Sequence, residues 1–121
     1  MDLLEIFKDS EDIIFVPAKT VVIREGDEGN KMYVVMDGEV SISIKDRVIA
    51  TAGDGEIVGE MALISPDLRS ATVTATADSH LAVIDQASFD SLLNHVPEFT
   101  MHVMDVLADR LKAAFEMIEE S

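Results

Sequence analysis

The residues best suited to chemistry lie in one stretch between positions 55 and 73. Glu60 follows Gly59 where a short apolar run ends, and its carboxylate can accept a hydrogen bond from a hydroxyl group. Further along, Arg69 carries a planar guanidinium group that can bind phosphate oxygens through two parallel hydrogen bonds. Residues 60–64 have room for one helical turn, whose N-terminus favours an anion. The stretch therefore suits a ligand that presents a phosphate and a hydroxyl together, as the ribose phosphate of a cyclic nucleotide does.

Other reactive groupings are not indicated by the sequence. His80, His95 and His102 do not have the spacing of metal ligands, and no arrangement of Ser, His and Asp suggests nucleophilic catalysis. The chain contains no cysteine, which excludes disulfides and thiolate sites. We therefore predict no catalytic residues and no metal or cofactor, and expect a binding protein rather than an enzyme.

A β-rich framework must position Glu60 and Arg69. Short β-branched runs alternate with glycine or polar turns, at the spacing of an antiparallel sandwich or roll. The expected strands are residues 13–16, 20–24, 32–36, 40–44, 48–51, 71–75 and 80–84, and a further strand that ends at Gly59.

Helices are predicted at both ends of this framework. Residues 3–7 form a short amphipathic helix, Asp85 or Ser88 caps a helix that runs to Asn94, and Pro97 begins a long helix that ends near Ile118. The long helix has apolar residues at spacings of three and four, namely Met104, Leu107, Leu111, Ala114 and Ile118. This stripe is either the face that covers the roll or the seam of a homodimer. Because Phe99, Val103 and Val106 widen the apolar surface, we predict that the helix serves both purposes, with Asp105, Asp109, Arg110 and Lys112 beside the seam.

Length and charge limit the possible partners. The chain has 121 residues, enough for a single domain over residues 1–121. Its 24 acidic and 9 basic residues give a net charge of −15, which disfavours nucleic acid and anionic membranes as partners. The first residues lack a basic leader and a long apolar segment, so we expect a cytoplasmic protein without direct membrane contact.

Two short motifs bear a family resemblance. Residues 59–63 read Gly-Glu-Met-Ala-Leu and residues 69–73 read Arg-Ser-Ala-Thr-Val. Together they resemble the phosphate-binding cassette of cyclic-nucleotide-binding domains, such as those of bacterial catabolite activator proteins. The resemblance implies a mainly β fold: an antiparallel, jelly-roll-like β-roll of about eight strands, with a short N-terminal helix and two C-terminal helices.

The resemblance also implies a role for individual residues. Glu60 would hold the ribose 2′-hydroxyl, Arg69 would pair with the cyclic phosphate, and Ser70 would add a hydroxyl contact. The turn at Gly59 and the backbone N–H groups of Met61 and Ala62 would complete the phosphate site. The candidates for the base pocket are Ile42, Ile49 and Val58.

The function implied is that of a regulatory sensor module, which binds a cyclic purine nucleotide without catalysis. cAMP is the first expected ligand and cGMP the second, and the output domain or partner protein lies outside this chain. The alternative is a ligand-free β-roll that serves dimerisation or protein interaction. The presence of both Glu60 and Arg69 favours the sensor, because a β-roll that no longer binds a ligand tends to lose the charged residues that hold the ligand. The sequence has Ala114 and Phe115 where bacterial activators carry hydroxyl groups that reach adenine, which predicts modest base selectivity.

Overall fold

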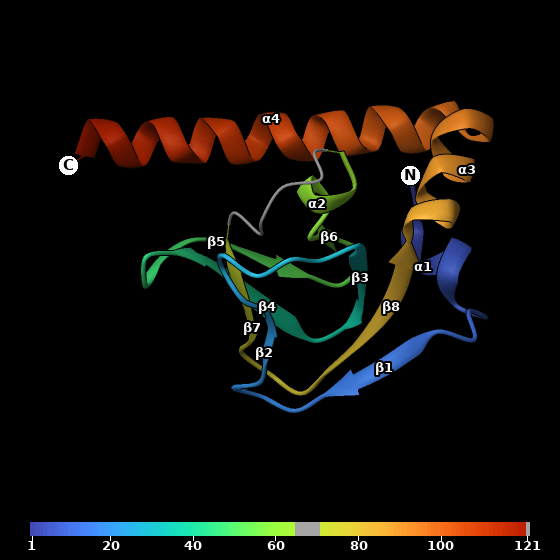
Figure 1. Cartoon of the computed structure of the whole chain (residues 1–121), viewed down its shortest axis with the longest axis horizontal. Helices are drawn as coiled ribbons and strands as arrows, with labels where there is room; N and C mark the ends of the chain where they lie inside the picture. Colours follow the sequence, from blue (N-terminus) through green and yellow to red (C-terminus); the bar gives the residue numbers. More distant parts are fainter. Residues whose placement is uncertain (65–70, 121) are drawn as a thin grey trace.

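The computed structural model describes residues 1–64 and 71–120, with the backbone alone described for residues 117 and 120. Within these residues eight strands form two antiparallel four-stranded sheets, which make a β-roll with helices along one side (Figure 1). The strands are β1 (Ile13–Val16), β2 (Val21–Ile23), β3 (Lys31–Asp37), β4 (Glu39–Ile44), β5 (Arg47–Gly53), β6 (Ile57–Val58), β7 (Thr72–Ala75) and β8 (Ser79–Asp85). The helices are α1 (Leu3–Phe7), α2 (Met61–Ile64), α3 (Gln86–His95) and α4 (Pro97–Glu120).

The strand order is β1-β8-β3-β6 in one sheet and β2-β7-β4-β5 in the other. The structure confirms the predicted β-roll, and each expected strand lies within two residues of its predicted ends. Asp85, rather than Ser88, caps α3: its carboxylate accepts a hydrogen bond from the Ser88 N–H at 2.8 Å. Helix α4 begins at Pro97 as expected.

Two clusters of buried side chains hold the molecule together. Successive side chains of a strand point to opposite faces of its sheet, so β3 contributes to both clusters. Met32 and Val34 pack with side chains of the four helices, whereas Val35 packs between the two sheets. The rings of Phe89 and Phe99 meet edge to face at 5.9 Å and join α3 to α4 within the first cluster. The sheet that contains β3 therefore packs against the helices with its outer face and against the second sheet with its inner face.

Helix α4 presents two different apolar surfaces. Phe99 and Val103 are buried against the roll, and Leu107 packs beside them. Met104 and Leu111 instead face solvent, with exposed fractions of 56% and 55%. The five residues predicted to form one stripe therefore do not share a surface, since Leu107 and Ala114 are half-buried while Met104, Leu111 and Ile118 are exposed. These residues lie on different sides because the roll buries Phe99 and Val103, which fixes how the helix is rotated about its axis.

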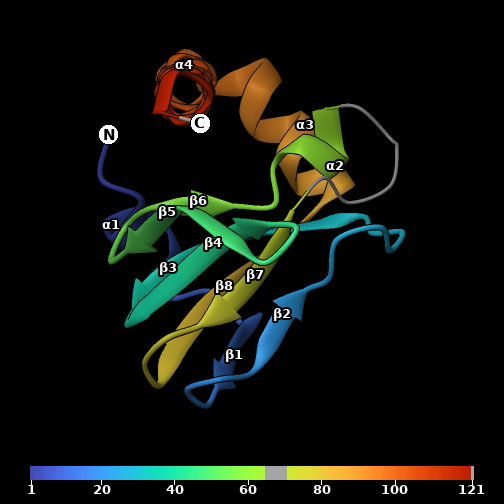
Figure 2. The same ribbon diagram turned by 90° about the vertical axis from the view of Figure 1, so that its left-hand side faces the viewer.

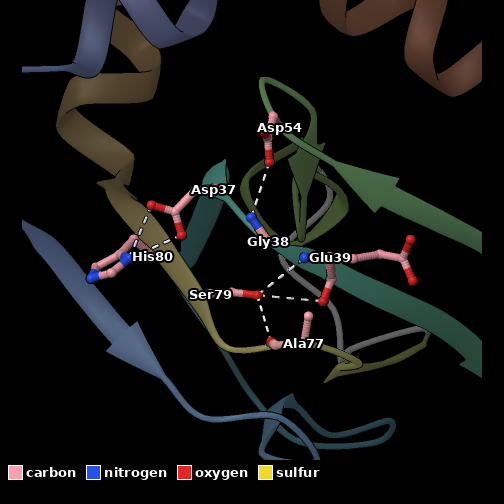
Figure 3. Close-up of polar contacts among 7 residues, drawn as sticks. All are labelled: Asp37, Gly38, Glu39, Asp54, Ala77, Ser79 and His80. Carbon is pink, nitrogen blue, oxygen red and sulfur yellow. Dashed lines mark hydrogen bonds and ion pairs between the residues drawn. The ribbon is translucent and has the colours of Figure 1, made fainter.

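The corner between β3 and β4 is pinned to β8 by polar contacts (Figure 3). Gly38 has a φ of +111°, and a Cβ at this position would lie 2.1 Å from the Ser79 hydroxyl oxygen. That buried hydroxyl accepts a hydrogen bond from the Glu39 N–H at 3.1 Å and donates one to the Ala77 carbonyl at 2.8 Å. The Gly38 N–H donates to the Asp54 carboxylate at 3.0 Å. Both the left-handed backbone and the close approach of Ser79 require glycine here.

Candidate functional site

The predicted cassette begins where β6 turns into α2. Gly59 makes this turn with a φ of +80°, a conformation that favours glycine. Glu60 follows, and its backbone carbonyl accepts hydrogen bonds from the Leu63 and Ile64 N–H groups at 3.0 and 3.3 Å. The side chain of Gln86, at the start of α3, donates to the Leu63 carbonyl at 3.1 Å and ties the end of α2 to the next helix. The C-terminal end of this short helix is thus held by α3.

The Glu60 side chain is the buried charge of this region, with an exposed fraction of 1%. One of its oxygens, Oε1, accepts a hydrogen bond from the Arg110 guanidinium group on α4. A second nitrogen of the same guanidinium donates to the backbone carbonyl of Ile57 in β6. Arg110 therefore neutralises the buried carboxylate and fastens α4 to the strand that precedes the cassette, which Figure 1 shows beneath the middle of α4.

The second oxygen of Glu60, Oε2, is buried and has no hydrogen-bond partner among the described residues. A buried oxygen in this state is rare in proteins, because losing water without a new hydrogen bond is unfavourable. The Leu63 and Ile64 N–H groups bond to the Glu60 carbonyl, so helix geometry leaves those of Met61 and Ala62 without an intrahelical acceptor. An unsatisfied acceptor and two amide donors therefore lie within three consecutive residues.

The other predicted site residues are placed as follows. Met61 is 44% exposed, and Ala62 is buried beside it. Arg69 and Ser70 lie outside the described residues. The three candidates for the base pocket belong to the cluster between the sheets, where Ile42 and Val58 are buried and Ile49 is half-buried. Their role in binding a base stays a prediction.

Arg110 is the contact of this site that the sequence analysis missed, because it was assigned to the flank of a dimer seam. The structure places it on the roll side of α4, 50 positions from Glu60. A signal was present: Arg110 lies seven residues after Val103 and three after Leu107, on the face that carries apolar residues. A single arginine on a buried helix face implies a buried acidic group opposite it.

Comparison with known proteins identifies the family. Residues 13–96 match the model of the cyclic nucleotide-binding domain. The chain belongs to this family. It is therefore a cyclic-nucleotide-binding module of the regulatory kind, as the cassette motifs predicted. The matched residues end one position before α4 begins.

Individual relatives agree with this assignment. The chain is 36% identical over 99 residues to the Pycsar effector protein PaPycTIR of Pseudomonas aeruginosa, covering 81% of the chain and 32% of that relative. It is also 36% identical over 88 residues to the cAMP-dependent protein kinase regulatory subunit of Schizosaccharomyces pombe, covering 72% of the chain and 21% of that relative. Among solved structures, the catabolite activator protein of Thermus thermophilus superimposes with a TM-score of 0.77 at 27% identity, over 88% of this chain and 53% of that one.

The chain spans about a third or less of the length of these two curated relatives. Over the described residues, none of the helices is both long and apolar enough to cross a bilayer.

Proposed function

We propose that this domain is a sensor whose first ligand is cAMP and second is cGMP, and that Glu60 and Arg69 hold the ribose phosphate. The observation that carries the proposal is the buried Oε2 atom of Glu60, which has no hydrogen-bond partner among the described residues. A ribose 2′-hydroxyl that donates to this atom would satisfy it, while Oε1 keeps Arg110.

The phosphate needs a cation and N–H donors. The backbone N–H groups of Met61 and Ala62 are predicted donors beside the turn at Gly59. Arg110 already donates hydrogen bonds to Glu60 and to the Ile57 carbonyl, so a different cationic side chain must bind the phosphate. Arg69 has this role by the family motif, with Ser70 adding a hydroxyl contact. The strongly acidic chain makes a dedicated arginine important, since its net charge of −15 repels an anionic ligand.

A route for the signal follows from the same contacts. Arg110 connects Glu60 to α4, so a ligand that engages the carboxylate acts directly on the attachment of this helix. We expect nucleotide binding to order the cassette and shift the C-terminal helices toward one of two positions. The helix would report ligand state to an output domain or partner protein in the cytoplasm.

Isothermal titration calorimetry with cAMP tests the proposed site. We expect Arg69→Leu to weaken binding by about 2–5 kcal/mol, because the phosphate loses its charged partner in a desolvated site. Glu60→Gln should weaken binding less, and should reduce the preference for cAMP over its 2′-deoxy analogue, because the charge-assisted hydrogen bond to the hydroxyl is lost. The matched controls are Arg47→Leu and Glu116→Gln, which change exposed residues.

Several results would contradict the proposal. Unchanged affinity in a folded Arg69→Leu variant would remove Arg69 from the site, and unchanged discrimination in Glu60→Gln would separate Glu60 from the ribose. If the wild-type chain binds neither cAMP nor cGMP at millimolar concentration, the ligand-free interaction module becomes the better description.

A further inference from the structure

The loop that follows β2 joins the end of the cassette to a distant turn of the roll. The backbone N–H of Glu25 donates a hydrogen bond to the Thr72 hydroxyl oxygen at 3.0 Å. One carboxylate oxygen of the same residue, Oε1, accepts a hydrogen bond from the Lys45 N–H at 2.9 Å. These partners lie 47 and 20 positions from Glu25, which is half-buried. Glu25 therefore connects three separate segments of the chain, and its two hydrogen bonds are here named the Glu25 junction.

The first bond of the Glu25 junction reaches the strand into which the cassette leads. Thr72 is the first residue of β7 and belongs to the second cassette motif. It pairs with Ser43 of β4, while the next residue, Val73, pairs with Ile23 of β2. Figure 2 shows β2, β7 and β4 side by side in this sheet. The Glu25 N–H adds a side-chain attachment at the point where β7 begins.

The other end of the cassette is attached in a similar way. The Gln86 side chain donates to the carbonyl of Leu63, near the end of α2, at 3.1 Å. Leu63 and Thr72 are thus held by other parts of the fold, and the predicted phosphate ligand Arg69 lies between them in the sequence. Because three residues of extended chain span about 11 Å at most, the start of β7 determines which positions the backbone of Arg69 can reach.

The second bond of the Glu25 junction supports a turn with an unusual backbone. Lys45 and Asp46 join β4 to β5, and their φ values are +51° and +66°. Non-glycine residues rarely adopt positive φ, and two-residue turns of this kind usually contain glycine. The Glu25 carboxylate stabilises the turn by accepting the hydrogen bond of the Lys45 N–H. The turn begins two residues after Ser43, the partner of Thr72, so both bonds of the junction act on the start of β7.

From these contacts we propose that Glu25 and Thr72 are positioning residues for nucleotide binding, and that the Glu25 junction holds the start of β7 where the cassette can engage the phosphate. This role rests on the proposed function, since it requires a cassette that binds a cyclic nucleotide. Neither residue contacts the ligand in this role. By thermodynamic linkage, a junction that strengthens nucleotide binding is strengthened by bound nucleotide to the same degree.

Calorimetric titration with cAMP tests the Thr72 hydroxyl. We expect Thr72→Val to weaken binding about tenfold, because the Glu25 N–H loses its acceptor and the start of β7 is no longer held. Thr72→Ser keeps a hydroxyl and should regain most of the affinity. The matched control is Thr76→Val, just beyond the other end of β7, where the threonine hydroxyl donates to the Glu39 carbonyl at 3.2 Å. This control makes the same change far from the cassette and should bind cAMP like wild type.

The Glu25 carboxylate is tested separately, because Glu25→Ala keeps the backbone N–H that binds Thr72. We expect Glu25→Ala to weaken cAMP binding by about threefold, less than Thr72→Val, since water can replace the acceptor at the exposed turn. Glu25→Gln keeps an acceptor oxygen and should bind like wild type. Glu28→Ala removes an exposed charge from the same loop and is the control for net charge. If Glu25→Gln binds as weakly as Glu25→Ala, the hydrogen bond to the turn does not position the cassette.

Hydrogen exchange measured by NMR tests the linkage in the wild-type chain. Saturating cAMP should slow exchange of the Glu25 N–H about tenfold, the factor expected for the loss of affinity in Thr72→Val. The control amide is the Thr76 N–H, which donates to the Glu39 carbonyl at 2.9 Å and should be slowed less. A hydrogen bond that only stabilises the fold would not be protected more strongly than this control. The measurement decides the question even if a variant fails to fold.

The outcomes separate this role from the proposed function. If wild type binds cAMP and a folded Thr72→Val variant binds it equally well, the Glu25 junction does not position the cassette. An equal loss of affinity in Thr76→Val would attribute the effect to the stability of β7 and would also overturn the proposal. A wild type that binds no cyclic nucleotide would remove the proposed function, and the positioning role with it.

Discussion

At the scale of single residues, the two oxygens of Glu60 have different surroundings, and this difference explains how one carboxylate can serve two purposes. Oε1 accepts a hydrogen bond from Arg110, while Oε2 is buried and has no partner among the described residues. The arginine compensates the buried charge, and the free oxygen leaves an acceptor for a ligand hydroxyl. In the proposed site, the same residue would bind the ligand hydroxyl and stay linked to α4.

The pair of Glu60 and Arg110 predicts a measurable loss of stability. Arg110→Met keeps much of the side-chain volume but leaves the carboxylate buried without its cation. We expect the free energy of unfolding to fall by about 3 kcal/mol, the lower end of the range for a broken buried ion pair. Urea denaturation followed by circular dichroism at neutral pH measures the change.

A double variant separates the ion pair from simple packing. Adding Glu60→Gln to Arg110→Met removes the uncompensated charge, so the double variant should be more stable than Arg110→Met alone. Arg47→Met, at an exposed position of β5, is the matched control. A loss no larger than that of the control would mean that the ion pair does not stabilise the fold.

These residues also show what the sequence could predict of the site. Glu60 could be proposed as a site residue because the cassette motif is local, with Gly59 before it and apolar residues after it. The partner of Glu60 was not, because Arg110 is 50 positions away and meets it only through the packing of α4. Local patterns define a motif, whereas long-range contacts depend on how helices lie on the roll.

At the scale of elements, turn residues and periodicity predicted the strands and helices well. Gly38 and Gly59 mark real changes of direction with positive φ values, and Pro97 begins α4. The faces of α4 were not predictable, because apolar residues surround much of this helix. Only the burial of Phe99 and Val103 shows which side meets the roll and which side remains outside.

The cap of α3 gives a prediction about pH. The backbone N–H and hydroxyl of Ser88 bond to the Asp85 carboxylate and lower its pKa below the ordinary value of 3.8. A pKa that is lower in the folded chain stabilises the fold above the ordinary value, and this contribution is lost as the pH falls through the lowered pKa.

Asp85→Asn isolates this effect, because asparagine is also a good N-cap but does not titrate. We expect the difference in stability between wild type and Asp85→Asn to shrink as the solution is acidified below pH 3.8, and to be constant near neutral pH. Thermal denaturation of both chains across this range measures the difference. A difference that is independent of pH would mean that the Asp85 charge does not contribute to the cap.

At the scale of the whole molecule, the pairing of the strands joins distant parts of the chain. β1 pairs with β8 and β2 pairs with β7, so the first strands are held by the last ones. The sequence predicted a roll but not this order, because pairing between distant strands leaves no local pattern. The proposed nucleotide site at Glu60 therefore belongs to a roll whose first strands are held by its last ones, and Arg110 attaches α4 to it.

The choice between adenine and guanine depends on the side chains that the roll and α4 offer to the base. The base-pocket candidates on the roll, Ile42, Ile49 and Val58, are apolar. On α4, Ala114 has no hydrogen-bonding side chain, and the apolar Phe115 side chain is 56% exposed. Apolar walls discriminate poorly between rings of similar size.

We therefore expect the affinities for cAMP and cGMP to lie within about tenfold of each other, a difference of about 1.4 kcal/mol or less. Calorimetric titration of the wild-type chain with each nucleotide measures both values, and 2′-deoxy-cAMP serves as the control that changes the ribose and leaves the base intact. Because Arg110 is the polar group that α4 holds against Glu60, Arg110→Met should weaken both nucleotides to a similar degree. A preference of several hundredfold would contradict an apolar base site, and its loss in Arg110→Met would identify the guanidinium group as the contact that recognises the base.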